Sequence, residues 1–154
     1  LAENNLVNGL DLPATLYADM GGSLMASEAV LKARLLQLQK GKGVRLDIAL
    51  SDAAAYLALP RTWGLTQPGA AVGGGHAGYR VYPCKDGRVA VAALEPHFAA
   101  ALGGAVGLKS SNIMAMFAPE SHAAIAAFLL TQTRQQLDQL AVDKDIPLMS
   151  LPST

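Results

Sequence analysis

One acidic residue, Asp19, stands two positions before a pair of glycines in the run Tyr17-Ala18-Asp19-Met20-Gly21-Gly22-Ser23. After a predicted loop over residues 1–18, this run opens an apolar segment that we predict to be a helix over residues 22–40, ended by Gly41. The free N–H groups and the dipole at a helix N-terminus keep a carboxylate ionised and fixed in direction. Asp19 is therefore placed for nucleophilic or proton-transfer chemistry. Asp is also a favoured helix N-cap, which on this run alone is the commoner role.

A second glycine run, Gly73-Gly74-Gly75-His76-Ala77-Gly78, fits the G-x-G-x-x-G pattern of dinucleotide-binding folds. That pattern binds a dinucleotide only when it follows a strand and opens a helix. The residues that follow, Tyr79-Arg80-Val81-Tyr82, have the pattern of a strand. We therefore reject a dinucleotide site. We predict a mobile glycine loop that closes over a site, with an ordinary linker over residues 60–75 as the alternative.

Metal and thiol chemistry are poorly supported by the sequence. His76, His97 and His122 lack the spacing of metal ligands, so we predict no metal site and no bound cofactor. Cys84 is the single cysteine, which excludes an internal disulfide and fits a reducing compartment such as the cytoplasm. A nucleophilic Cys84 needs a nearby histidine, and a cysteine at a strand end is the simpler interpretation.

Composition indicates a globular chain without nucleic-acid or membrane partners. Of the 154 residues, 51% are hydrophobic and 16% are charged, which is enough apolar material for a core. Twelve basic and twelve acidic residues cancel, and no basic stripe stands out. No uncharged apolar run is long enough to span a bilayer, and the start does not resemble a signal peptide. Because the first residue is Leu1, we expect a piece of a longer protein.

The remaining patterns predict a mixed α/β (α+β) fold. Alternating apolar residues over 44–50 predict a strand, and a helix over 52–59 is expected to close at Pro60. Asp86-Gly87 between two strand patterns, at 79–82 and 88–92, predicts a β-hairpin. Proline at 96 opens a helix, two more helices lie near 120–130 and 133–142, and residues 146–149 form a short extended exit.

Four motifs in order resemble the middle of a family III CoA-transferase, the CaiB/BaiF family that includes the 2-methylacyl-CoA racemases. They are listed here in chain order: Ala18-Asp19-Met20-Gly21-Gly22; Gly41-Lys42-Gly43-Val44-Arg45-Leu46-Asp47-Ile48-Ala49-Leu50-Ser51-Asp52; Gly74-Gly75-His76-Ala77-Gly78-Tyr79-Arg80-Val81-Tyr82 with Asp86-Gly87-Arg88; and Val91-Ala92-Ala93-Leu94-Glu95-Pro96-His97-Phe98. Each motif alone is weak, but four in order with natural spacing are specific. The resemblance favours a catalytic role for Asp19 over that of a helix cap.

The resemblance implies a fragment with two parts and a dimeric assembly. Residues 1–62 would end a segment of a large Rossmann-like domain, and residues 63–154 would form the linker and a small helical and β-hairpin domain. Members of the family form homodimers of interlocked subunits and act on acyl-CoA and carboxylic acid substrates, with the coenzyme A thioester as substrate. We expect the isolated chain to be inactive and not to be a monomer.

Three functions follow from these implications. In a transferase, Asp19 would attack the thioester to form an anhydride and then an aspartyl-CoA thioester, with Gly73, Gly74 and Gly75 shielding the intermediate. In a racemase, Asp19 and a histidine supported by Glu95 would exchange the α-proton, and N–H groups near Gly21 and Gly22 would hold the enolate oxygen. A non-catalytic, self-associating scaffold is the third possibility.

Overall fold

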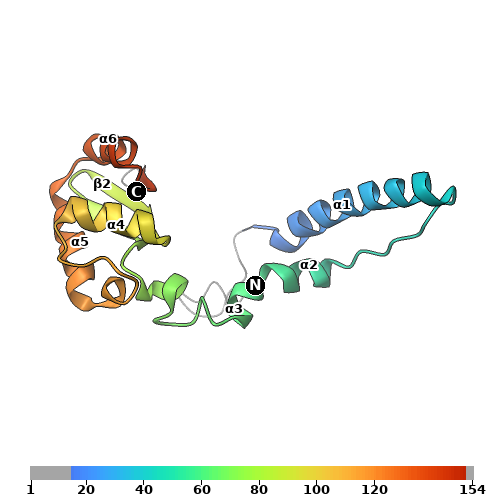
Figure 1. Cartoon of the computed structure of the whole chain (residues 1–154), viewed down its shortest axis with the longest axis horizontal. Coiled ribbons are helices and arrows are strands. Elements are labelled where there is room, and N and C mark those ends of the chain that lie inside the picture. The colour runs from blue at the N-terminus through green and yellow to red at the C-terminus, as the bar shows by residue number, and fades with distance from the viewer. Residues whose placement is uncertain (1–14, 152–154) are drawn as a thin grey trace. The chain divides into compact units, whose positions relative to one another are not determined.

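The computed structural model describes residues 15–151 of the chain, which divides into two compact units, Leu1–Gly64 and Leu65–Thr154 (Figure 1). The first unit contains α1 (Tyr17–Lys40), α2 (Leu50–Leu57) and α3 (Leu59–Thr62). The second contains, in order, η2 (Ala71–Gly75), β1 (Tyr79–Cys84), β2 (Gly87–Ala92), α4 (Pro96–Val106), η3 (Ala115–Phe117), α5 (Pro119–Thr131), α6 (Arg134–Lys144) and β3 (Leu148–Leu151). Helices combined with a small antiparallel sheet confirm the predicted α+β class. The loop predicted over residues 1–18 lies outside the described residues up to residue 14, and its last two residues, Tyr17 and Ala18, belong to α1.

Helix α1 begins five residues earlier than we predicted from the sequence. It starts at Tyr17 after the N-cap residue Leu16, so the prediction that the two glycines open the helix was wrong. Its end is as predicted: Gly41 adopts a left-handed φ of 66°, and its N–H donates to the Gln37 carbonyl at 2.8 Å. A glycine in this conformation satisfies a carbonyl of the last turn at no steric cost.

The two glycines of α1 form the surface on which α2 packs. A Cβ on Gly21 would lie 3.0 Å from Cδ1 of Leu57, and a Cβ on Gly22 would overlap the Leu50 side chain. Gly22 and Ala53, one from each helix, are the two buried residues within the described part of this unit, 15–64. Each glycine destabilises a helix by roughly 1 kcal/mol relative to Ala. The close approach of α2 explains why α1 nevertheless has glycine at both positions.

The segment between α1 and α2 is not the strand that we predicted over 44–50. Residues 43–49 have no regular structure, and Val44, Leu46 and Ile48 remain 40%, 37% and 40% exposed. An alternating pattern forms a half-buried strand only where a neighbouring strand pairs with it and a core covers its apolar face. In the described part of this unit, the segment is flanked by helices and has no strand to pair with. The next helix also differs: α2 ends at Leu57, and Pro60 lies in the first turn of α3.

The second unit is built on a three-stranded antiparallel sheet in the order β1-β2-β3. Cys84 pairs with Gly87, so the predicted hairpin is present, and its two-residue turn is Lys85-Asp86, one position before the Asp-Gly pair that predicted it. The predicted extended exit is a true strand, because Leu148–Leu151 pairs with β2 and extends the sheet. Tyr82, Cys84, Val89 and Val91 are buried, which places the core against one face of the sheet.

Three helices and a 3-10 turn supply the rest of this core, as Figure 1 shows around the hairpin. Helix α5 packs on β1, and α6 packs on β2 and β3. The largest fully buried side chains include Leu102 of α4, Met116 of η3, Ile125 and Leu129 of α5, Leu137 of α6 and Ile146. Helix α4 starts with Pro96 in its first turn, as the sequence predicted, and ends at Val106, with Gly107 (φ 80°) as its C-cap.

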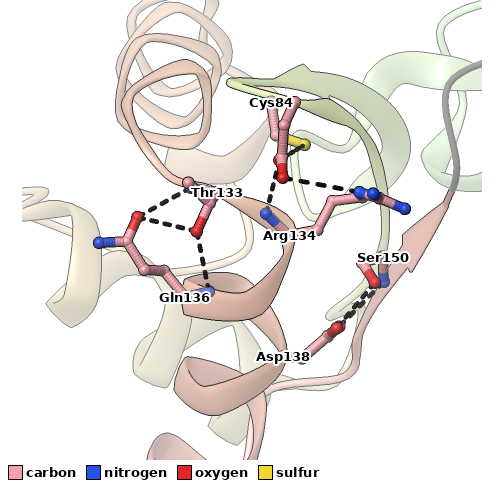
Figure 2. A network of polar contacts seen from close by, with 7 residues as sticks. Cys84, Thr133, Arg134, Gln136, Asp138 and Ser150 are labelled. Carbon is pink, nitrogen blue, oxygen red and sulfur yellow. Dashed lines mark hydrogen bonds and ion pairs between the residues drawn. The ribbon is translucent and has the colours of Figure 1, made fainter.

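Polar contacts fix the start of α6 and join it to the sheet (Figure 2). Thr133 and Gln136 form a capping box, in which the Gln136 N–H donates to Thr133 Oγ1 at 3.2 Å and the Thr133 N–H donates to Gln136 Oε1 at 2.8 Å. The N–H of Arg134 donates to Oδ1 of Asp86 in the hairpin turn at 2.7 Å. The Ser150 hydroxyl of β3 donates to Asp138 at 2.8 Å. These contacts fix α6 in position against the hairpin turn and against β3.

Within residues 15–151, no helix is both long enough and apolar enough to cross a membrane.

Candidate functional site

Asp19 lies in the first turn of α1, three residues after the N-cap, and its side chain is exposed. The N-cap position belongs to Leu16, whose side chain makes no cap hydrogen bond, so the interpretation of Asp19 as the cap was wrong. The positive end of the helix dipole still favours its ionised carboxylate. The Ser23 hydroxyl donates to the backbone carbonyl of Asp19 at 2.9 Å and leaves the carboxylate itself available.

The N–H groups of Gly21 and Gly22 are not the free donors that we predicted. Because α1 begins at Tyr17, both glycines lie within the ladder of i to i−4 hydrogen bonds. The donors without an intrahelical acceptor belong instead to residues 17–19, since Met20 N–H already donates to the Leu16 carbonyl at 2.9 Å. Any oxyanion contact at this helix end therefore shifts to the backbone around Asp19.

The glycine run forms a tight turn that leads into a strand. Residues Ala71–Gly75 form η2, in which Gly73 and Gly74 depart from helical dihedral angles, and β1 begins at Tyr79. A Cβ on Gly73 would collide with the Gln67 carbonyl, and a Cβ on Gly75 with the carbonyls of Gly69 and Ala70. The strand after Gly78 is inconsistent with a dinucleotide-binding helix, as predicted. Mobility of this loop stays a prediction.

His122 ties the glycine run to α5. Its Nε2 lies 2.9 Å from the Gly75 carbonyl, a contact between residues 47 positions apart. The Ala77 N–H donates to the Met116 carbonyl at 2.8 Å, which adds a second tie to η3. An open groove of about 810 Å³ runs beside the loop, and its lining includes the basic residues Arg80 and His122 and no acidic residue. This groove suits a negatively charged group.

His76 is a buried polar residue whose role the sequence analysis did not predict, because we considered it there only as a metal ligand. It is 2% exposed, its Nδ1 accepts from the Gly78 N–H at 3.1 Å, and its ring meets Phe117 edge-on at 5.5 Å. Burial, and secondarily the charge of His122, lowers the pKa of His76. The imidazole is thus held neutral at the base of the glycine loop. A histidine directly after a glycine run was the available signal.

Tyr82, on β1, is buried and lines the groove that Arg80 and His122 also line. Its hydroxyl donates to the Ala77 carbonyl at 2.8 Å. Burial raises the pKa of Tyr82, while the nearby charge of Arg80 acts in the opposite direction. Tyr82 therefore stays protonated and fixes the backbone between the glycine loop and β1.

Glu95 occupies the N-cap position of α4 in an extended conformation, with φ −67° and ψ 143°. Its exposed side chain makes no cap hydrogen bond, so the carboxylate is not engaged by the helix that it precedes. Asp19 belongs to the first unit and Glu95 to the second, and each is described within its own unit. The predicted roles of both carboxylates stay predictions.

Cys84 and the histidines offer no metal centre within the part of the chain that the structure covers. Among residues 15–151, no group of three or more His, Cys, Asp or Glu side chains is placed to hold a metal ion. Cys84 is buried at the end of β1, with Sγ 3.8 Å from Oδ1 of Asp86. Its surroundings are those of a core residue at a strand end.

Comparison with known proteins identifies the family. The model of CoA-transferase family III matches residues 11–153, almost the whole chain. This chain belongs to CoA-transferase family III. The fold is similar to the crystal structure of a hypothetical protein, Rv3272, from Mycobacterium tuberculosis, with a TM-score of 0.67 and 18% sequence identity over 96% of this chain. The chain spans 44% of that protein, so the likeness concerns the fold of this part alone.

Proposed function

We propose that the protein containing this chain transfers CoA between carboxylic acids, with the carboxylate of Asp19 as nucleophile. The observation that carries the proposal is an exposed carboxylate in the first turn of a 24-residue helix, within a chain that belongs to CoA-transferase family III. Acyl-CoA and a carboxylic acid are the substrates that this function requires. The basic groove beside the glycine loop supports a carboxylate-bearing substrate.

The reaction is a sequence of acyl transfers. Asp19 attacks the thioester carbonyl, the C–S bond breaks, and an acyl-aspartyl anhydride forms as CoA leaves as a thiolate. The thiolate then attacks the aspartyl carbonyl, which releases the first acid and leaves an aspartyl-CoA thioester. The acceptor carboxylate then attacks the aspartyl-CoA thioester, which forms a second anhydride and releases the CoA thiolate. This thiolate attacks the acceptor's carbonyl in the anhydride, so the new acyl-CoA leaves and the Asp19 carboxylate is regenerated. The N–H groups of residues 17–19, which have no acceptor within α1, are suited to the developing oxyanion.

The glycine run has a supporting role in this proposal. Aspartyl anhydrides and thioesters hydrolyse unless water is kept away. A backbone with no side chains at residues 73–75 packs closely over an intermediate without steric conflict. In the structure this run is tied to α5 through His122 and to η3 through Ala77.

A 2-methylacyl-CoA racemase is the second candidate, and one observation favours it. The Glu95 side chain is exposed and makes no cap hydrogen bond, so it is available to support a histidine base, as the resemblance implies. In that reaction one base removes the α-proton of the acyl group and a second returns it on the opposite face. Exchange of the α-proton with solvent deuterium, without transfer of CoA, would favour this alternative.

The experiment uses the longest translation product that contains this sequence. It is incubated with acyl-CoA, quenched and mapped by mass spectrometry for an adduct on Asp19. The variant Asp19→Asn is compared with Asp52→Asn, which changes an exposed carboxylate in the first turn of α2. We expect the adduct and turnover to vanish in the first variant and persist in the second. An adduct on another side chain, with turnover intact in Asp19→Asn, would exclude Asp19 as nucleophile. If the unsubstituted protein shows neither turnover nor an adduct, the non-catalytic scaffold is favoured.

A further inference from the structure

The free edge of β1 lies along an open groove in the second unit. This strand ends the sheet order β1-β2-β3, and four of its residues in a row, 80–83, line the groove of about 810 Å³ beside the glycine run. Consecutive side chains of a strand point to opposite faces of a sheet. A groove that meets four consecutive residues therefore lies along the edge of the strand and not over one face. Helix α5 contributes Pro119, His122, Ala123 and Ala126 to the same lining.

Hydrogen bonds around the sheet show which backbone groups of β1 point to this edge. The Ala93 N–H donates to the Gly78 carbonyl at 2.7 Å, so the bonds between β1 and β2 fall on every second residue from 78, that is on 80, 82 and 84. The backbone groups of residues 79, 81 and 83 therefore point away from β2. Tyr79 agrees with this direction, because its N–H donates outside the sheet, to the His76 carbonyl at 3.0 Å.

The outward groups of β1 have the pattern that an added strand uses. Pro83 has no N–H, and the N–H of Tyr79 is already bonded within the chain. Over the described residues 15–151, the N–H of Val81 has no hydrogen-bond partner. The edge therefore offers one open donor, at Val81, together with the carbonyls of Tyr79, Val81 and Pro83. A peptide that adds a strand to a sheet pairs its backbone with such groups.

The opposite edge of the sheet, on β3, has its outward donors bonded by the chain itself. The N–H of Leu148 donates to the Ile146 carbonyl at 2.7 Å. The N–H of Ser150 donates to Oδ1 of Asp138 at 3.2 Å. The two edges therefore differ, and β1 is the edge with a donor available to another strand.

The charge of the groove decides which kind of strand fits. Its lining includes the basic residues Arg80 and His122 and no acidic residue. A second copy of β1, paired about Val81, would place two basic edges together, and its Pro83 would have no N–H for the Tyr79 carbonyl. An acidic strand meets neither difficulty. We propose that the free edge of β1 binds an extended acidic peptide segment, whose backbone pairs with Val81 and whose carboxylate lies against Arg80.

Peptide binding goes beyond the transfer of CoA proposed above and does not rest on it. The proposed transfer uses only the positive charge of the groove, which a small carboxylic acid also satisfies. Backbone pairing with β1 adds a requirement that only an extended chain fulfils. A bound peptide would cover Arg80 and would therefore compete with a carboxylic acid for the groove.

The test measures binding of a dye-labelled peptide, TVEVT blocked at both ends, to the full 154-residue chain by fluorescence anisotropy. With either valine of the peptide opposite Val81, the glutamate lies on the same face of the sheet as Arg80. We expect a dissociation constant on the order of 100 μM, and about fivefold weaker binding of the peptide TVKVT. Glutarate has the carboxylates without an extended backbone, so it should not displace TVEVT at an equal concentration.

Variants at one position of β1 test the backbone pairing. Val81→Pro removes the outward N–H without removing a hydrogen bond to β2, whereas Val81→Thr changes the same side chain and keeps the N–H. We expect about a fivefold loss of TVEVT binding in Val81→Pro and less than about a twofold loss in Val81→Thr. Circular dichroism checks that both variants are folded.

A second pair of variants tests the charge and leaves β1 unaltered, so it decides the matter even if Val81→Pro does not fold. Ala123→Glu places a negative charge at an exposed residue of the lining. Ala127→Glu places the same charge at an exposed residue of α5 that is not part of the lining. We expect about a fivefold loss of TVEVT binding in the first variant and no loss in the second.

Several results would overturn the proposal. They are equal binding of TVEVT and TVKVT, full binding to a folded Val81→Pro variant, equal binding to Ala123→Glu and Ala127→Glu, and no binding of TVEVT at about 1 mM chain. Displacement of TVEVT by an equal concentration of glutarate would instead assign the groove to small acids. If TVEVT does not bind and Val81→Pro lowers the mass of the chain in light scattering, the occupant of this edge is a second copy.

Discussion

Glycines and one buried histidine set the local structure of the second unit. Gly73 and Gly75 lie so close to neighbouring carbonyls that no side chain fits, and Gly74 adopts a positive φ of 94°. His76 follows directly, with both its burial and its contact to Gly78 fixed by the same turn. The conformation of this run is therefore determined by backbone contacts, which single substitutions can test.

Replacing Gly75 by alanine is expected to destabilise the second unit. The new Cβ would collide with the carbonyls of Gly69 and Ala70, and backbone atoms cannot move aside cheaply. We expect a loss of about 1–3 kcal/mol in the free energy of unfolding, measured by urea denaturation. Gly104→Ala, inside α4 with open space around its Cβ, is the control and should be neutral or stabilising by up to about 1 kcal/mol. A Gly75→Ala variant as stable as this control would refute the close packing.

His76 is expected to make the second unit less stable in mild acid. Burial, then the charge of His122, lowers the pKa of His76 below the ordinary value of 6.5. The unfolded chain therefore binds a proton before the folded chain does, so stability is constant above about pH 6.5 and decreases as the pH falls toward the lowered pKa. Denaturation midpoints measured from pH 7.5 to 5.5 should show this decrease, and His76→Gln should remove it. His97→Gln, at an exposed position on α4, should keep it, and a flat profile in the unsubstituted chain would contradict the prediction.

Single residues were only partly readable from the sequence. Asp19 was found from its position before a helix, but the N-cap role was misassigned because Tyr17 and Ala18 also fit a helix. A pair of glycines such as Gly21 and Gly22 allows another group to approach the helix backbone closely. The sequence could not reveal that Leu50 and Leu57 of α2 would make that approach in place of a substrate. Which group packs against a glycine depends on contacts between residues distant in the sequence, and a local pattern does not show them.

Elements defined by local chemistry were predicted well, and those defined by a partner were not. The hairpin from Tyr79 to Ala92 follows from Asp86-Gly87, whose turn preference is local. The strand predicted over 44–50 is absent, because alternation alone cannot say whether a neighbouring strand is present. Conversely, residues 148–151 read only as an extended exit, and pairing with β2 makes them a strand.

The capping box at the start of α6 should contribute measurably to the stability of the second unit. Thr133 and Gln136 satisfy each other's backbone N–H groups at the helix N-terminus. Thr133→Ala is expected to cost about 1 kcal/mol in the free energy of unfolding, since an N-cap hydroxyl is lost. Gln135→Ala, on the same turn and exposed, should change stability by less than about 0.5 kcal/mol. Equal effects of the two substitutions in thermal or urea unfolding would show that Asp86 alone secures this helix end.

The two units differ sharply in how much core they contain. The second unit buries side chains from its sheet and from all three of its longer helices. In the described part of the first unit, residues 15–64, the buried residues are Gly22 and Ala53, neither of which has a large side chain. Burial of large apolar side chains is the main favourable term in folding. The described part of the first unit therefore lacks a core of large apolar side chains, and much of its apolar surface stays exposed.

Helix α1 shows where that surface lies. Met20, Leu24, Leu31, Leu35 and Leu38 fall within about 60° of one another on a helical wheel and form an apolar stripe. These side chains are between 56% and 74% exposed. The opposite face, with Gly22, Met25, Ala29 and Leu36, is buried or half-buried. The helix is thus apolar on two sides, and only one of them is covered within the unit.

Self-association of the chain is the expected consequence of this exposed stripe. Leaving five large apolar side chains in water costs about 1.5–3 kcal/mol each, a sum comparable with the stability of a whole domain. We expect light scattering on the 154-residue chain, at about 10 μM, to give a mass above the 16.0 kDa of a monomer. Leu31→Lys with Leu38→Lys should reduce the mass toward the monomer, because each places a charge within the stripe. Gln37→Lys with Gln39→Lys adds the same charge elsewhere on α1 and should leave the mass unchanged. A folded monomer of the unsubstituted chain, with α1 helical by circular dichroism, would show that the stripe is tolerated in water.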